Sequence, residues 1–268
     1  MQMNEKGLLM NQEQRRITMI HMLLNEREQF RNIDVPENEQ EQRRLLRSLL
    51  NIRPASPAKE DFLKIQDTYL REEINRKGIV DIRDLVPFRN GLYLWQGDIT
   101  TLRCDAIVNA ANSGMTGCYQ PCHNCIDNCI HTYAGIQLRN ICAEIMDRQG
   151  SEEPVGRAKI TPAYNLPCRY VIHTVGPTVE AELSAEKEMQ LASCYRSCLE
   201  LADENEVKSI AFCCISTGVF RFPNKRAAEI AVETVRWYKE KTNSEIEVIF
   251  NVWKDIDSAI YRDILGRD

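Results

Sequence analysis

No part of this 268-residue chain approaches the roughly 20 consecutive apolar residues that a transmembrane helix needs. Its first residues, MQMNEKGLLMNQEQRR, also lack the basic segment and apolar run of a secretory signal peptide. We therefore expect a cytoplasmic protein with no membrane partner. In that reducing compartment the 11 cysteines are expected to be thiols, so a close group of them favours metal binding or catalysis over disulfides.

The chain likewise lacks an excess of positive charge. Its formal net charge is −5, whereas sequence-independent nucleic-acid binding requires a basic face that displaces counterions. We therefore expect no nucleic-acid partner. A small anionic ligand is compatible with this charge, because backbone amides and helix N-termini bind anions without net positive charge. The hydrophobic content of 43% is that of an ordinary globular protein.

Residues 1–80 show apolar side chains at helical spacing in three segments separated by proline-containing stretches. These apolar positions are Ile17, Ile20, Leu23 and Leu24, then Leu45, Leu46, Leu49 and Leu50, then Phe62, Ile65 and Tyr69. Each amphipathic helix must bury its apolar stripe. We expect an N-terminal helical extension over 1–80 that docks on a domain over 81–268.

From about residue 80, short β-type runs alternate with helical stretches. The expected strands lie within 92–97, 104–111, 157–164, 169–176, 209–216 and 245–253, and the expected helices lie near 126–148, 185–205, 224–241 and 256–265. Nearly continuous apolar runs such as IAFCCI indicate strands covered on both faces, hence a three-layer αβα sandwich. Ligands of such sheets usually bind at the carboxyl ends of the strands.

Five short motifs occur in order along this region. They are GDIT at 97–100, AIVNAAN at 106–112, IDNCIHTYAG at 126–135, HTVGP at 173–177 and ISTGVFRFP at 215–223. Together they resemble the macrodomain family, which binds ADP-ribose, over roughly residues 85–265. The resemblance implies an α/β fold with a mixed, mostly parallel sheet. Without this resemblance, the turn before the helix near Asn224 would have two interpretations. It could bind a diphosphate through its backbone amides, or it could simply connect a strand to the helix.

The resemblance also implies individual roles. Asp98 would hydrogen-bond the adenine amino group, Ile99 would lend a backbone contact beside it, and Asn112 would contact the distal ribose. Trp253 would pack on adenine, although a tryptophan after a buried strand is about as often part of a core. The loop around the diphosphate would be Ser216, Thr217, Gly218, Val219 and Phe220, with Phe220 also packing on the distal ribose.

The segment GCYQPCHNCIDNCIHTYAG, residues 117–135, replaces the glycine-rich run of many macrodomains. It resembles a zinc-containing, largely bacterial subclass that acts as ADP-ribosyl hydrolases. Members are often linked with a sirtuin-type ADP-ribosyltransferase and a lipoyl-carrier protein that it modifies. The subclass pattern Cys-x4-His-x-Cys implies Zn²⁺ ligands at Cys118, His123 and Cys125. Three ligands leave an open, catalytic position, whereas Cys122 as a fourth would make the site structural.

The neighbouring helix has an apolar stripe that places Cys129 and Cys142 in the core. Asp127 matches an aspartate of hydrolytic macrodomains and would orient or deprotonate a water, although it also complements a helix N-terminus. His131 is expected to pack or to bond the backbone, and His173 to follow a strand. Neither histidine is expected to be catalytic.

These observations favour a zinc-dependent hydrolase that removes mono-ADP-ribose from modified protein side chains, with Asp127 and Asn112 as catalytic residues. It would cleave the bond at the anomeric carbon of the distal ribose. The main alternative is a non-catalytic reader of ADP-ribose with a structural zinc. Two others are a metal-free thiol switch and an enzyme that removes a terminal phosphate or acyl group from ADP-ribose itself.

Overall fold

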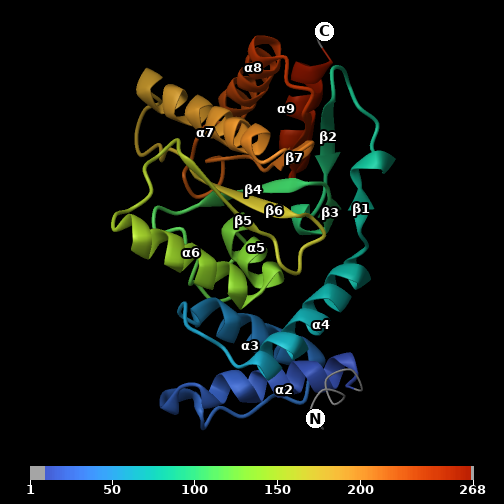
Figure 1. Ribbon diagram of the computed structural model, residues 1–268, viewed down its shortest axis with the longest axis vertical. Coiled ribbons are helices and arrows are strands. Elements are labelled where there is room, and N and C mark those ends of the chain that lie inside the picture. The colour runs from blue at the N-terminus through green and yellow to red at the C-terminus, as the bar shows by residue number, and fades with distance from the viewer. Residues whose placement is uncertain (1–9, 267–268) are drawn as a thin grey trace.

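The apolar runs form a six-stranded sheet in the computed structural model, which describes residues 10–266 (Figure 1). The strand order is β2-β8-β7-β4-β6-β5, and only β5 and β6 pair antiparallel. The predicted mixed, mostly parallel sheet is thus confirmed. The strands are β2 (Leu92–Gln96), β4 (Ala106–Ala111), β5 (Ala158–Pro162), β6 (Tyr170–Val175), β7 (Ser209–Phe212) and β8 (Glu247–Val252). A separate parallel pair joins β1 (Val80–Asp81) to β3 (Leu102–Arg103).

Helices cover both faces of the six-stranded sheet. One layer holds α7 (Ala185–Glu204), α8 (Asn224–Thr242) and α9 (Asp255–Leu265), and the other holds α5 (Ile126–Ala134) and α6 (Ile136–Gln149) (Figure 1). The central strands are buried on both faces, as their continuous apolar runs predict. None of the helices in the described range 10–266 is long and apolar enough to cross a membrane.

The helix expected near 126–148 is two helices, and this prediction was wrong. Gly135 separates α5 from α6 with φ of 98°, a backbone conformation that glycine adopts without strain. A Cβ atom at this position would lie 2.7 Å from the side chains of Gln66 and Gln137. The apolar periodicity continues across the break, which is why the sequence pattern does not reveal it.

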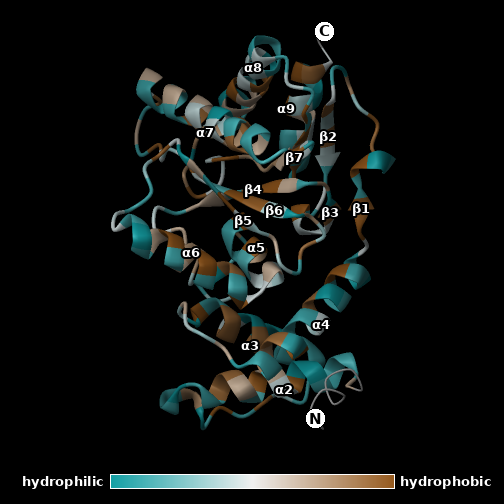
Figure 2. Ribbon diagram, viewed as in Figure 1, coloured by the Kyte–Doolittle hydropathy of each residue, from teal (hydrophilic) through white to brown (hydrophobic). Residues whose placement is uncertain are grey.

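Among the residues that the structure describes, three α-helices precede the sheet domain, as expected: α2 (Gln12–Asn25), α3 (Glu39–Ile52) and α4 (Glu60–Lys77). Each carries both hydrophobic and hydrophilic residues (Figure 2). Their apolar side chains form a hydrophobic cluster of their own, which also includes Ile136 of α6. Ile74, near the end of α4, belongs instead to the cluster around the sheet. The extension therefore packs against the sheet domain in two places, through its contact with α6 and through the C-terminal end of α4. The domain boundary near residue 80 stays a prediction.

Arg139 of α6 fastens the end of α3. Its side chain is buried, and its Nη1 donates hydrogen bonds to the carbonyl oxygens of Leu50 (3.1 Å), Asn51 (2.8 Å) and Arg53. The last carbonyls of a helix have no partner within the helix, so Arg139 satisfies groups that would otherwise be buried without one. Its Nε donates to the carbonyl oxygen of Thr116 at 2.8 Å, in the loop after β4.

Replacing Arg139 should therefore destabilise the whole fold. We expect Arg139→Met to lower the free energy of unfolding by about 3 kcal/mol, because several buried carbonyl groups lose their donor. Urea denaturation followed by circular dichroism measures this. The matched control is Arg148→Met on the same helix, where an exposed guanidinium pairs with Glu144 at 3.6 Å. Equal losses in the two variants would contradict this role of Arg139.

Candidate functional site

The loops singled out in the sequence gather at one edge of the sheet. Because β2, β8, β7, β4 and β6 are parallel, their carboxyl ends meet at that edge. Asn112 follows β4 directly, and Trp253 follows β8 directly. Asp98 comes two residues after β2, and the turn that contains Ser216 follows β7. The fold thus brings the expected ligand-binding loops to a common edge.

Asp98 is held as a hydrogen-bond acceptor. It caps a short 3-10 helix (Ile99–Thr101), and its Oδ1 accepts from the backbone nitrogen (3.0 Å) and the Oγ1 (2.6 Å) of Thr100. Lys77 of α4 donates to its Oδ2 at 2.8 Å, a partner that the sequence did not reveal. Burial opposes ionisation, but the bonds from Lys77 and Thr100 hold the pKa of Asp98 below its ordinary value. Ile99 is buried, and its side chain belongs to the hydrophobic cluster around the sheet.

The turn from Ser216 to Phe220 is tightly folded. Ser216 has φ of 64°, and its carbonyl oxygen accepts from the nitrogen of Phe222 at 3.0 Å. Its buried Oγ has no hydrogen-bond partner among the described residues. Val179 anchors the other end by donating to the carbonyl oxygen of Phe220 at 2.8 Å. Gly218 and Val219, between these anchors, are exposed, so the tip of the turn is free to meet a ligand.

Trp253 is 71% exposed. The core alternative for this residue is therefore wrong. Its carbonyl oxygen accepts from Gln96 Nε2 at 3.3 Å, which links the ends of β8 and β2. An exposed indole at this edge offers a flat apolar face to a planar ligand.

Asp127 is a buried carboxylate in the first turn of α5. Asn109 donates to its Oδ1 at 2.8 Å, and Asn112 lies 3.4 Å from its Oδ2. Burial raises the pKa of Asp127 to about 6, although the bond from Asn109 opposes this shift. Asn109 is itself buried within β4 and was not predicted as a site residue. A polar residue inside the apolar run AIVNAA is the signal that identifies it.

Two buried histidines lie close to Asp127 or to its partner Asn109. His131 Nε2 is 3.6 Å from Asp127 Oδ1, and neither ring nitrogen of His131 has a hydrogen-bond partner among the described residues. Of the two alternatives expected for His131, packing is therefore the one observed, and no backbone hydrogen bond is formed. His173 lies within β6 rather than after it, with Nδ1 3.1 Å from Asn109 Nδ2 and Nε2 3.0 Å from Thr161 Oγ1. Burial lowers the pKa of both imidazoles, to about 3 for His173, so they are neutral.

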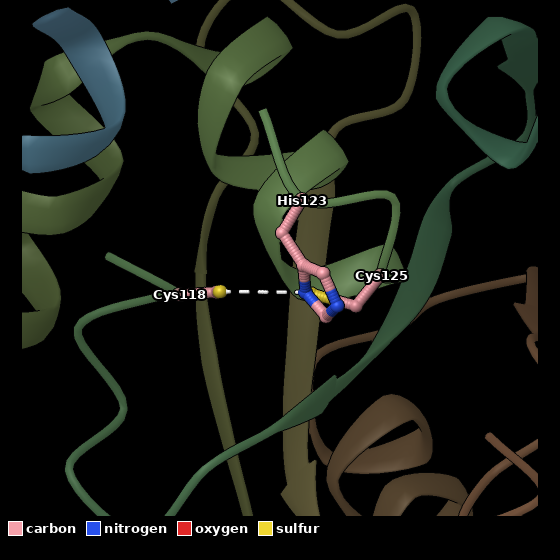
Figure 3. A group of neighbouring side chains, drawn as sticks. All are labelled: Cys118, His123 and Cys125. Carbon is pink, nitrogen blue, oxygen red and sulfur yellow. Dashed lines mark hydrogen bonds between the residues drawn. The ribbon is translucent and has the colours of Figure 1, made fainter. Parts of the chain in front are cut away.

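Cys118, His123 and Cys125 point toward one another (Figure 3). Their ligand atoms all lie within 4.8 Å of one another, and Cys118 Sγ is 3.6 Å from His123 Nδ1. Tetrahedral Zn–S and Zn–N bonds of about 2.3 and 2.0 Å would place these two atoms about 3.5 Å apart. Two thiol groups and an imidazole at this spacing fit a zinc ion. Cys125 is also the N-cap of α5.

Cys122 faces away from this group. Its Sγ lies 3.2 Å from Ser48 Oγ and 3.4 Å from the carbonyl oxygen of Arg44, both on α3. Cys122 has a left-handed backbone, with φ of 54°, and its sulfur points toward α3 rather than toward the candidate ligands. Among the residues in 10–266, the sulfur atoms grouped within 4.8 Å of a ring nitrogen of His123 are therefore those of Cys118 and Cys125, the two predicted cysteine ligands. Cys142 is buried as expected, whereas Cys129 is only partly buried.

Comparison with known proteins identifies the family. Residues 108–231 match the Macro domain family. A Trypanosoma brucei macrodomain, solved in complex with ADP-ribose, is 30% identical with a TM-score of 0.63, over 82% of this chain and 95% of that one. The chain belongs to the macrodomain family. A relative from Treponema medium, named "Protein-ADP-ribose hydrolase", is 57% identical over 96% of this chain and all of its own length.

A third relative is longer than this macrodomain chain. It comes from Fusarium oxysporum f. sp. cubense and is named "Probable bifunctional ADP-ribose hydrolase/ADP-ribosyltransferase". It is 42% identical over 83% of this chain, which spans 40% of that relative.

Acid should lower the stability of the macrodomain because His173 is buried in its neutral form. Its pKa is about 3 when folded and about 6.5 when unfolded, so only the unfolded chain gains a proton between these values. The stability from neutral His173 is thus complete above about pH 6.5 and is lost as the pH falls toward about 3. We expect the difference in unfolding free energy between wild type and His173→Gln to narrow from about pH 7 to about pH 4.5 in urea titrations.

The exposed His21 of α2 provides the control for this experiment. His21→Gln should keep the same difference from wild type at both pH values. A constant difference for His173→Gln as well would show that His173 is not the group that takes up the proton.

Proposed function

We propose that this macrodomain is a zinc-dependent hydrolase that removes mono-ADP-ribose from modified protein side chains. The observation that carries the proposal is the position of a buried carboxylate, Asp127, two residues after a Cys-His-Cys group that fits zinc. The name of the Treponema medium relative, which matches along its whole length, supports the same activity. The alternative, a reader of ADP-ribose, needs the binding loops but gives Asp127 no task.

The binding loops supply positions for each part of ADP-ribose. Asp98 is an ionised acceptor suited to the adenine amino group, with the backbone of Ile99 beside it and the exposed Trp253 as a stacking surface. The turn from Ser216 to Phe220 would wrap the diphosphate with its backbone amides. Asn112 would contact the distal ribose, which brings that sugar toward Asp127.

In this proposal, Asp127 is the residue that acts on water. Cleavage develops positive charge at the anomeric carbon of the distal ribose. Asp127 would accept a proton from the attacking water as the water oxygen bonds to that carbon. The bond to the acceptor side chain breaks before or as this new bond forms, and the acceptor leaves with the bonding electrons and takes up a proton. Asn109 holds Asp127 Oδ1, so Oδ2 is the oxygen that faces the ligand side with Asn112.

Cys118, His123 and Cys125 would hold the zinc ion. All three side chains are partly buried, and both cysteines are free thiols. When bound, Zn²⁺ supplies Lewis acidity to an oxygen of the ribose or of water at its open fourth position. The Fusarium relative, whose name joins hydrolase and transferase, supports an ADP-ribosyltransferase as the source of the substrate. We propose a lipoyl-carrier protein modified by a sirtuin-type transferase as that substrate.

Asp127→Asn should separate hydrolysis from binding. The amide keeps the shape but cannot accept the proton, so release of ADP-ribose from a mono-ADP-ribosylated protein should fall by at least about 100-fold. Affinity for free ADP-ribose, measured by calorimetry, should stay close to wild type. The control is Asp147→Asn, at an exposed position of α6, which should turn over normally.

If wild type binds ADP-ribose but leaves the protein label intact, the chain is a reader. Release of phosphate or an acyl group from small ADP-ribose derivatives, with no action on the protein label, would favour the small-molecule enzyme instead.

Metal content should distinguish the cysteines. Wild type purified under reducing conditions should contain about one zinc per chain, and Cys118→Ser should lose it. Cys122→Ser is the matched control and should keep the zinc, because its sulfur faces α3. Mass spectrometry of the metal measures all three proteins. Loss of zinc from Cys122→Ser would make Cys122 a fourth ligand, and a wild type without zinc would favour the thiol switch.

A further inference from the structure

Helix α3 of the N-terminal extension contacts the segment that carries the candidate zinc ligands. We call residues 117–125 the Cys–His loop. Arg47 Nη2 donates to the carbonyl oxygen of His123 at 2.7 Å, which is a short hydrogen bond from a charged donor. The same nitrogen donates to Asn128 Oδ1 at 2.9 Å and lies 3.6 Å from Cys129 Sγ. One guanidinium group from the extension thus binds both the loop and the helix that follows it.

Asn128 extends this contact to the other two candidate ligands. Its side chain is completely buried, and its Nδ2 donates to the carbonyl oxygens of Cys118 (3.3 Å) and Gln120 (3.0 Å). Its backbone nitrogen lies 3.4 Å from Cys125 Sγ, which caps the helix. Arg47 and Asn128 together therefore hold the backbone of Cys118 and His123 and contact the sulfur of Cys125.

A second contact from α3 fixes the middle of the Cys–His loop. Asn51 Oδ1 accepts from the backbone nitrogen of Cys122 at 2.9 Å, and Ser48 Oγ lies 3.2 Å from Cys122 Sγ. Cys122 has a left-handed backbone, which costs a non-glycine residue about 1 kcal/mol unless its surroundings stabilise it. These bonds stabilise that conformation, and the next side chain, His123, lies with its Nδ1 3.6 Å from Cys118 Sγ.

We infer that Arg47 is a positioning residue, through which the N-terminal extension holds the Cys–His loop in its ligand-bearing shape before metal binds. This inference rests on the zinc site proposed above. A loop that is already ordered loses less conformational entropy when it binds an ion, so its affinity is higher. Groups that orient metal ligands from outside the coordination shell commonly change metal affinity by about 10–100-fold. In this chain the extension supplies such a group.

The first test is zinc affinity in the full-length protein. Metal is removed with a chelator, and Zn²⁺ is returned in competition with a chromophoric chelator. Arg47→Met keeps the apolar stem but removes the donors, so it should bind zinc about 10–100-fold more weakly. Arg47→Lys, which retains the charge and one donor group, should recover part of this loss.

The matched control is Arg43→Met, one turn earlier on α3. Arg43 is bonded to Glu39 and Glu73, both within the extension. Its loss removes an arginine from the same helix without touching the Cys–His loop, so zinc affinity should equal that of wild type. Equal weakening by both variants would mean that general loosening of the extension is responsible, which would overturn the role of Arg47.

The second test uses no zinc and so reads the ordering of the loop directly. In metal-free protein, amide hydrogen exchange over residues 117–125 should be faster in Arg47→Met than in wild type, and unchanged in Arg43→Met. With Co²⁺ in place of zinc, the visible spectrum reports whether the sulfur ligands still bind. Wild-type exchange together with wild-type zinc affinity in Arg47→Met would overturn the inference.

These measurements separate this inference from the proposed function. If wild type binds no zinc, the zinc-dependent hydrolase fails, while the exchange experiment still decides whether Arg47 orders the loop. If Arg47→Met does not fold, Asn128→Asp tests the same link. It keeps the acceptor for Arg47 but removes the donor to the carbonyl groups of Cys118 and Gln120, so it should also weaken zinc binding. Wild-type affinity in that variant would overturn the inference.

Discussion

The hydrogen bond between Asn109 and Asp127, 2.8 Å long, is the interaction on which the candidate site depends. It joins the central strand β4 to the first turn of α5, and both side chains are buried. Removing the partner of a buried charge generally costs several kcal/mol, so the start of α5 has a strong preference for this position. Cys125 caps the same helix, and the Cys–His loop leads into it. The location of the candidate zinc ligands therefore follows from the pairing of a carboxylate with a strand.

The N-terminal extension contributes to both ends of this site, but to different degrees. At the adenine end, Lys77 pairs with Asp98, and both side chains are about a third exposed, at 31% and 32%. Such a pair contributes at most about 1 kcal/mol, because solvent screens it. At the metal end, the contacts of Arg47 are partly buried and reach main-chain groups of the loop. We therefore expect the extension to affect metal binding, through Arg47 of α3, more than it affects adenine binding, through Lys77 of α4.

The sequence predicted what local patterns can encode. Continuous apolar runs identified the strands, and short motifs identified the loops at their carboxyl ends. Arg47, Lys77 and Asn109 were missed because their partners lie on other elements, 18 to 81 residues away. Spacing also left Cys122 ambiguous, because the sequence reveals neither its left-handed backbone nor the contacts of its sulfur with α3. What sequence reasoning lacked was the docking of one element on another, and that docking completes the site.

Several residues of this site are poor choices for stability alone. A serine or aspartate would cap α5 better than Cys125, because sulfur is a weak acceptor. Glycine would adopt the backbone of Ser216 without strain, and an aliphatic residue would fill the position of Asn109 in a buried strand without needing polar partners. Each departure places a sulfur, a hydroxyl or an amide at or near the same edge of the sheet. Local rules that fail together at one place indicate that chemistry, rather than folding, accounts for those residues.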